Sequence, residues 1–185
     1  MTKHEELVEL LATRSARLGE FTLASGARSN LYIDARMTAM SPEGLALIGP
    51  LGIGEITVAG WMADSVGGLT LGADPISYAI AYASALAGKP IRAFTVRKEA
   101  KTHGTGKLIE GPFTPSDQVV IIEDVITTGG SALKAIDAVR NAGATVIGVL
   151  SLVDREEGGR ERIEAAGYDV RSLARAQEIV ARMQQ

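Results

Sequence analysis

The chain has 185 residues, of which 46% are hydrophobic and 22% are charged, and its formal net charge is −3. This length and composition predict one folded domain, residues 1–185, and the negative charge argues against nucleic acid as a partner. Cysteine is absent, which excludes disulfides, cysteine–zinc sites and a thiol nucleophile and is consistent with the cytosol.

The N-terminal segment is polar and leads into a helical pattern. Residues 1–6 do not resemble a signal peptide, and no apolar run approaches the ~20 residues of a membrane span. We therefore expect a cytoplasmic protein that does not bind a membrane. Residues 5–17 carry leucines on one stripe, which predicts an amphipathic helix that Gly19 ends. His4 has no partner in the sequence, and we expect it at the surface.

Two short alternating runs follow, on either side of a Ser-Gly-Ala-Arg-Ser turn. They span residues 21–34 and predict a β-hairpin, which for this segment alone could be a plain structural hairpin. Ser41-Pro42-Glu43 then gives a helix start. Because Pro50 and three nearby glycines disfavour helix, we expect this helix to be kinked or interrupted near Pro50.

A first strand–loop–helix unit occupies residues 63–86. A short apolar run, residues 63–66, leads into Gly-Gly-Leu-Thr-Leu-Gly-Ala-Asp-Pro at 67–75, and a helical run follows at 76–86. Glycines let backbone N–H groups approach an anion, and the start of a helix is positive. The unit therefore suits an anion, although a tight turn without a ligand remains the alternative.

A basic segment follows the predicted strand at 91–96. Residues 97–107 read Arg-Lys-Glu-Ala-Lys-Thr-His-Gly-Thr-Gly-Lys, with four cations and one acid. Its glycines predict a mobile loop, and Pro112 and Pro115 close it before the next strand. A solvated basic loop is the default interpretation. It is not a Walker loop, because no Ser or Thr follows Lys107.

The most informative stretch is Val-Val-Ile-Ile-Glu-Asp-Val-Ile-Thr-Thr-Gly-Gly-Ser at residues 119–131. Its first four residues are typical of a strand buried on both faces of a parallel sheet. The hydroxyl- and glycine-rich turn and the predicted helix at 132–142 offer donors to a phosphate. Glu123 and Asp124 would repel a phosphate, so they fit better beside sugar hydroxyls or holding Mg²⁺ through water. The alternative is an ordinary strand–helix turn.

The C-terminal third continues the alternation. A strand at 145–152 leads to Asp154 and Arg155, which could be only a local ion pair, and then come helices at 160–166 and 173–183 around a strand at 168–173. Strands that alternate with helices predict an α/β fold with a mainly parallel sheet flanked by helices. Ligands of such sheets bind beyond the carboxyl ends of the strands, so both glycine loops, the acidic pair and Arg155 should share one cleft.

Residues 123–131 resemble the motif of type I phosphoribosyltransferases that binds 5-phosphoribosyl 1-diphosphate (PRPP). The resemblance implies that the two acids contact the ribose hydroxyls and that the loop holds the 5-phosphate. The implied contacts are Glu123, Asp124, Val125, Ile126, Thr127, Thr128, Gly129, Gly130 and Ser131. Residues 67–75 resemble the pyrophosphate loop of the same family, which adds Ala73 and also Asp74, acting through Mg²⁺. Other members carry a lysine in this loop, and this chain does not.

Two further segments resemble the orotate phosphoribosyltransferase branch of the family. The first segment is similar to the flexible catalytic loop of that branch, which here spans about residues 97–113. The similarity lies in Arg-Lys-Glu-Ala-Lys followed, after one residue, by His-Gly. In that branch the loop closes over the neighbouring subunit's site, which implies a homodimer with a catalytic loop acting in trans. The residues implied to meet the pyrophosphate are Arg97, Lys98, Lys101 and His103.

The second segment is the hairpin, about residues 19–36, which resembles the N-terminal hood of that branch. The resemblance implies that Tyr32 and Ile33 bind orotate, together with Thr127, and that Arg155 binds its carboxylate. Many members carry a lysine just before the Ser-Gly of the hood, where this chain has Ala24. Arg28 is the candidate for the missing positive charge.

The implied reaction transfers the phosphoribosyl group of PRPP to orotate, with Mg²⁺ as cofactor and with Lys101, His103 and Asp124 as catalytic residues. One alternative is a phosphoribosyltransferase for a purine, but purines lack the carboxylate that Arg155 would bind. The other is a PRPP-sensing regulator without catalysis. Against it, we expect no additional nucleic-acid-binding domain, and the segment that resembles the catalytic loop contains the lysine and the histidine.

Overall fold

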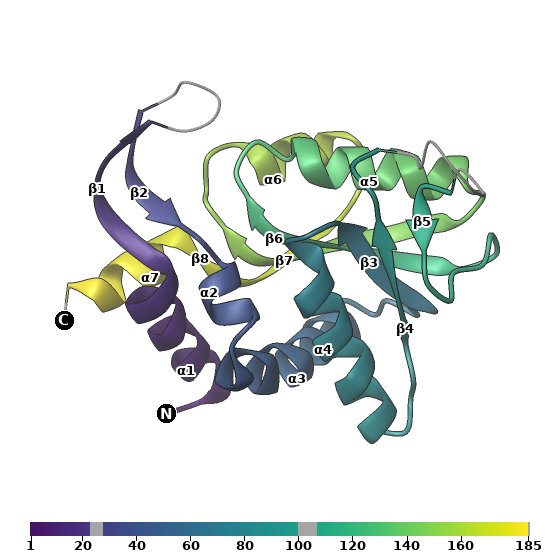
Figure 1. Ribbon diagram of the computed structural model, residues 1–185, viewed down its shortest axis with the longest axis horizontal. Coiled ribbons are helices and arrows are strands. Elements are labelled where there is room, and N and C mark those ends of the chain that lie inside the picture. The colour runs from purple at the N-terminus through teal and green to yellow at the C-terminus, as the bar shows by residue number, and fades with distance from the viewer. Residues whose placement is uncertain (23–27, 100–106, 185) are drawn as a thin grey trace.

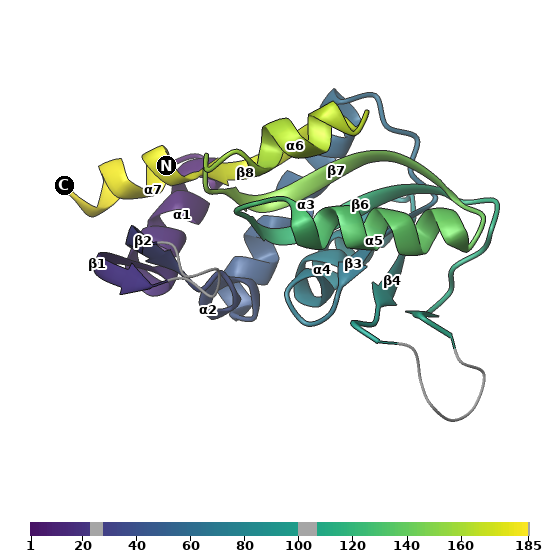
Figure 2. The same cartoon turned by 90° about the horizontal axis from the view of Figure 1, so that it is seen from above.

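The structure is a computed structural model that describes residues 1–22, 28–99 and 107–184 (Figure 1). A six-stranded sheet lies between helices on its two faces, and a two-stranded hairpin stands beside the N-terminal helix (Figures 1 and 2). In chain order the elements are α1 (Lys3–Leu10), the π-helical turn η1 (Leu11–Ser15), β1 (Ala16–Thr22), β2 (Arg28–Ile33), α2 (Arg36–Ala39), α3 (Pro42–Val58), β3 (Ser65–Leu69), α4 (Ala73–Leu86), β4 (Arg92–Val96), β5 (Ile109–Glu110), β6 (Gln118–Ile126), α5 (Gly130–Asn141), β7 (Thr145–Asp154), α6 (Gly159–Ala165), β8 (Val170–Arg175) and α7 (Ala176–Met183).

The sheet has the order β5-β4-β3-β6-β7-β8, and only β5 runs antiparallel to its neighbour. This confirms the predicted α/β fold with a mainly parallel sheet. The central strand β6 is buried on both faces: Val120 and Ile122 pack in one apolar cluster, with α1, α3 and α4, whereas Val119 and Ile121 pack in another, with α5. The carboxyl ends of β3, β4, β6 and β7 therefore share one edge of the sheet.

The N-terminal helix is shorter than the sequence predicted, and Gly19 does not end it. The helical segment ends at Ser15, and Gly19 lies inside β1. Tertiary contacts set this boundary, because the Ser15 carbonyl accepts a hydrogen bond from the Asp34 amide at 2.9 Å and the Ser15 hydroxyl lies 2.7 Å from that of Thr38. Ala16 then pairs with Ile33, so the hairpin starts earlier than expected.

The sequence predicted a helix that is kinked or interrupted near Pro50, and the predicted interruption was wrong. Helix α3 runs from Pro42 to Val58 with Pro50 inside it. Its glycines have a packing role, because a Cβ on Gly49 would lie 2.6 Å from the Ala79 carbonyl oxygen of α4. Close packing between α3 and α4 therefore offsets the weak helix propensity of this sequence.

Smaller differences concern the C-terminal third and the first helix. Strand β7 continues to Asp154, so Arg155 follows it directly, and β8 and α7 begin later than predicted. His4 is not without a partner, since its Nε2 lies 3.5 Å from Glu178 of α7. Among the described residues, no helix combines the length and the apolar character that crossing a bilayer requires.

Two glycines of α3 provide a matched test of the packing. Gly49→Ala should lower the free energy of unfolding by about 1–3 kcal/mol, because the new methyl group overpacks the contact with α4. Gly54→Ala should raise it by roughly 0.5–1 kcal/mol, because a Cβ there has no neighbour within 4 Å and alanine favours helix. Urea denaturation measures both. Equal effects of the two substitutions would contradict the close contact.

Candidate active site

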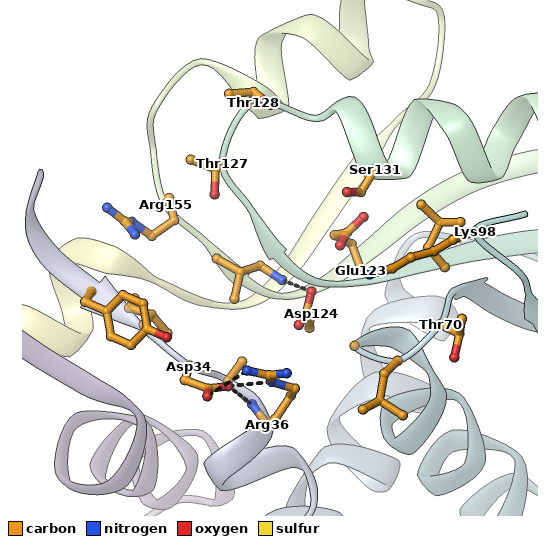
Figure 3. Close-up of a pocket in the computed structure, with 17 residues that line it drawn as sticks. Asp34, Arg36, Thr70, Lys98, Glu123, Asp124, Thr127, Thr128, Ser131 and Arg155 are labelled. Carbon is orange, nitrogen blue, oxygen red and sulfur yellow. Dashed lines mark hydrogen bonds and ion pairs between the residues drawn. The ribbon is translucent and has the colours of Figure 1, made fainter. Parts of the chain in front are cut away.

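A cavity of about 510 Å³ lies at the shared edge of the sheet, between the hairpin and the carboxyl ends of the strands (Figure 3). It brings together residues that are far apart in the sequence. The predicted site residues that line it are Tyr32, Ile33, Lys98, Glu123, Asp124, Val125, Thr127, Thr128, Ser131 and Arg155. The hairpin, the loop after β3 and the end of β6 therefore form one site.

The turn between β6 and α5 has the geometry of an anion site. Gly129 precedes the first residue of α5 with φ +74°, a left-handed conformation that favours glycine. The unpaired N–H groups at the start of this 12-residue helix and the nearby hydroxyl groups border a hollow of about 150 Å³. This hollow is also lined by three predicted residues that do not line the larger cavity, namely Ile126, Gly129 and Gly130.

The two acids at the end of β6 differ in environment. Glu123 is 8% exposed, and burial followed by the negative charge of Asp124 raises its pKa well above the ordinary value. Asp124 accepts a hydrogen bond from the Val125 amide at 2.9 Å. Its carboxylate faces the loop after β3, since a Cβ on Gly72 would lie 2.3 Å from Oδ2. The loop can approach Asp124 so closely only because position 72 has no side chain.

Arg155 reaches the cavity as a buried cation whose side chain is 5% exposed. Its Nη2 donates to the Ser29 hydroxyl of the hairpin at 2.9 Å and pairs with Glu157. The Nε atom is buried and has no hydrogen-bond partner among the described residues. A buried arginine with an unused donor is suited to an anionic ligand.

The interpretation of Asp154 and Arg155 as a local ion pair was wrong. Asp154 instead pairs with Arg160 at 2.7 Å and accepts the Glu156 amide at 2.8 Å, which leaves Arg155 available to the cavity.

Several predicted residues lie elsewhere. Asp74 and Ala73 are buried at the start of α4 and do not line the cavity. The Asp74 carboxylate accepts hydrogen bonds from Thr70 at 2.7 Å and from Thr95 at 2.8 Å, so it anchors the loop rather than facing a ligand. Arg97 pairs with Glu110 at 3.0 Å outside the cavity lining.

Four positions singled out from the sequence belong to the catalytic loop and the hood. Lys101 and His103 lie outside the described residues, as does Ala24. Arg28, the candidate for the charge missing at position 24, is the exposed first residue of β2 and does not line the cavity.

Sequence reasoning missed three polar residues of the hairpin and its exit. Ser29 contacts Arg155, whereas Asp34 and Arg36 line the cavity next to Tyr32. The only local signal was the Asp-Ala-Arg order directly after the hairpin, which places two opposite charges two residues apart.

The carboxylates fit a magnesium ion that is held mainly by a ligand. Among the described residues, no group of three or more His, Cys, Asp or Glu side chains could hold a metal by itself. Mg²⁺ in phosphate-binding sites takes one or two carboxylates, waters and the ligand's own phosphates. Asp124, which lines the cavity beside the loop, matches such a partial site.

The chain matches a known family over more than half its length. Residues 79–183 match the phosphoribosyl transferase domain, so fold and site together define a phosphoribosyltransferase. The chain is 46% identical over 183 residues to the orotate phosphoribosyltransferase of Aquifex aeolicus, covering 97% of this chain and 99% of that one. It is 47% identical over 169 residues to the orotate phosphoribosyltransferase of Mycobacterium avium, covering 91% and 92%.

A solved structure agrees with these relatives. The orotate phosphoribosyltransferase of Mycobacterium tuberculosis in complex with PRPP matches with a TM-score of 0.81 and 40% identity, covering 97% of this chain and 99% of that one. The chain belongs to the orotate phosphoribosyltransferase family.

The buried Glu123 should make stability depend on pH. Its pKa in the folded state is raised above the ordinary value of 4.5, so the folded state binds the proton more tightly than the unfolded state does. The resulting stabilisation of the fold is complete below pH 4.5 and is lost as the pH rises through the raised pKa. Glutamine cannot ionise, so the free energy of unfolding of Glu123→Gln, measured relative to the natural chain, should be higher at about pH 8 than at about pH 4. Urea denaturation at both pH values measures the gain. The exposed Glu161→Gln is the control, and a gain that does not grow with pH would contradict the burial argument.

Proposed function

We propose that this cavity is where the enzyme transfers the 5-phosphoribosyl group of PRPP to orotate, giving orotidine 5′-phosphate and pyrophosphate in pyrimidine nucleotide synthesis. The single observation that carries the proposal is the shared cavity, which joins a buried arginine, an acidic pair and a phosphate-type loop. Orotate carries a carboxylate that a cation can bind, and its ring nitrogen releases its proton to water or to the departing pyrophosphate as it bonds to C1. The task of the protein is therefore to position the substrates and to stabilise the departing pyrophosphate.

The base is held on the hairpin side of the cavity. The buried guanidinium of Arg155 binds the orotate carboxylate through the donors that Ser29 and Glu157 leave free. Tyr32 and Ile33 of β2 border the ring, and Thr127 lines the same cavity. Purine bases have no carboxylate for Arg155, which favours orotate over the purine alternative.

The sugar phosphate lies along the end of β6. The backbone amides and hydroxyls of residues 127–131 bind the 5-phosphate, and Glu123 and Asp124 contact the ribose hydroxyls. A protonated Glu123 can both donate to and accept from a hydroxyl group. The Thr70-Leu71-Gly72 loop faces Asp124 and receives the pyrophosphate group.

Breaking the bond between C1 and the pyrophosphate leaves positive charge on the sugar and negative charge on the leaving group. Lys98 lines the cavity, and Lys101 and His103, which follow it in the sequence, meet the pyrophosphate from the catalytic loop. When bound, Mg²⁺ neutralises phosphate charge, and we propose that Asp124 holds it through water. Asp74, anchored by Thr70 and Thr95, supports the loop and is a weaker candidate for that role.

We also propose a homodimer in which the catalytic loop acts on the neighbouring site. Large apolar side chains gather around the pyrophosphate loop and helix α4, and such exposed patches mark contact surfaces. The exposed residues are Met37, Met40, Leu71, Tyr78, Tyr82 and Leu86. A cytoplasmic location is proposed from the absence of cysteine. The regulator alternative has no comparable support, because the relatives are named as enzymes.

Turnover and base recognition can be tested together by following the ultraviolet absorbance of orotate after PRPP and Mg²⁺ are added. Arg155→Met should raise the KM for orotate roughly ten- to hundredfold, because a charge-assisted contact to the carboxylate is lost. The KM for PRPP should change little. Arg171→Met, which removes an exposed arginine paired with Asp169, is the control. An unchanged KM for orotate would remove Arg155 from base recognition, and turnover with a purine instead of orotate would contradict the proposal.

The catalytic loop and the dimer can be tested by mixing two inactive variants. Lys101→Ala should lower kcat by about 10²–10³ with little effect on orotate affinity, because the lysine acts on the leaving group. Asp124→Asn should also lower activity, because it removes the carboxylate proposed to contact the ribose and to hold Mg²⁺ through water. A mixture of the two should recover part of the activity, since a mixed dimer has one intact site. Absence of recovery, with dimers confirmed by light scattering, would argue against a loop acting in trans.

A further inference from the structure

The proposed pyrophosphate loop has no cation of its own, but one lies across the cavity from it. Residues 70–72 are Thr, Leu and Gly, whereas Arg36 lines the same cavity from the start of α2. Arg36 and Leu71 also border an adjoining hollow of about 430 Å³. In Figure 3 Arg36 lies between Asp34 and Asp124, on the side of the cavity that faces the loop.

Arg36 is held in place by one carboxylate. Its Nε donates to Oδ1 of Asp34 at 2.8 Å and its Nη2 to Oδ2 at 2.9 Å, while its backbone amide donates to Oδ1 at 3.2 Å. Nη1 makes no hydrogen bond within the described part of the chain. The hydrogen bonds that Arg36 donates to the Asp34 carboxylate raise the pKa of Arg36, and the negative charge of Asp124 adds a smaller contribution. Arg36 is thus a cation of fixed orientation whose Nη1 donors are available to a ligand.

The structural role of this ion pair is small. The Arg36 side chain is 48% exposed, and ion pairs at such exposure contribute little to stability. A bidentate carboxylate does, however, fix the plane of the guanidinium group and so reduces the entropy lost when a second anion binds. The geometry therefore favours a role in binding over a role in folding.

We propose that Arg36 binds the pyrophosphate group of PRPP and supplies the positive charge that the Thr70-Leu71-Gly72 loop lacks. The inference rests on the proposed placement of pyrophosphate at that loop. In the transfer, the C1–oxygen bond breaks and its electron pair stays on the pyrophosphate oxygen. The orotate ring nitrogen forms the new bond to C1, and the proton that it carried passes to water or to the departing pyrophosphate. A fixed guanidinium at the leaving group stabilises the charge that develops there.

The direct test is calorimetric titration of the full-length enzyme with pyrophosphate in the presence of Mg²⁺. Arg36→Met should weaken binding roughly ten- to hundredfold and lower kcat, whereas Arg36→Lys should recover part of the loss. Ribose 5-phosphate, which carries only the 5-phosphate group, should bind the natural chain and Arg36→Met equally. Arg14→Met, which removes an exposed arginine paired with Glu43 at 2.9 Å, is the matched control. Unchanged pyrophosphate affinity in Arg36→Met, or equal weakening for both ligands, would overturn the proposal.

A second variant separates this inference from the placement on which it rests. Leu71 is exposed and borders the same hollow, so Leu71→Lys adds a cation on the loop itself. As a single substitution, Leu71→Lys should tighten pyrophosphate binding. Combined with Arg36→Met, it should restore the binding that Arg36→Met loses. If Leu71→Lys tightens binding but Arg36→Met has no effect, the placement holds and the role of Arg36 is wrong. If neither substitution changes pyrophosphate affinity, the placement at this loop fails as well.

Discussion

The site depends on how closely strand β3 and its loop approach strand β6. A Cβ on Gly68 would lie 1.9 Å from the Ile122 carbonyl oxygen, and one on Gly72 would lie 2.3 Å from the Asp124 carboxylate. Any side chain at position 68 would require one strand to move, and any side chain at position 72 would displace the Asp124 carboxylate. Because the strands are parallel, this approach brings the proposed pyrophosphate loop against the proposed sugar-binding acids. The cavity is a consequence of that contact.

The second requirement is the connection between the hairpin and the sheet. The Ser29 hydroxyl accepts a hydrogen bond from Arg155, which joins the hairpin to the end of β7. The Asp34 amide donates to the Ser15 carbonyl and closes the base of the hairpin. Arg155 therefore serves two purposes, since the same guanidinium that would bind the base also positions the strand that borders it. Asp154 pairs with Arg160 instead of with Arg155, whose guanidinium contacts Ser29 and Glu157.

The features that the sequence predicted well are local in the chain. The apolar run at 119–122, the acids after it and the glycine-rich turns each lie within a short segment, and the periodicity or turn chemistry of that segment determines its structure. The failures have a tertiary cause. The helix that ends at Ser15 is limited by contacts with residues 34 and 38, and α3 persists through Pro50 because α4 packs against it. The roles of Ser29 and Arg36 depend on partners that only folding brings near.

The hydrogen bond between Ser29 and Arg155 joins residues 126 positions apart in the chain. The turn at 127–131, by contrast, is built from one strand and the helix after it. Contacts between distant segments form late, because closing long loops is entropically costly. The half of the site proposed for the sugar phosphate therefore depends mainly on contacts that are local in the chain. The half proposed for the base must wait until β7 has joined the sheet and Arg155 can reach the hairpin.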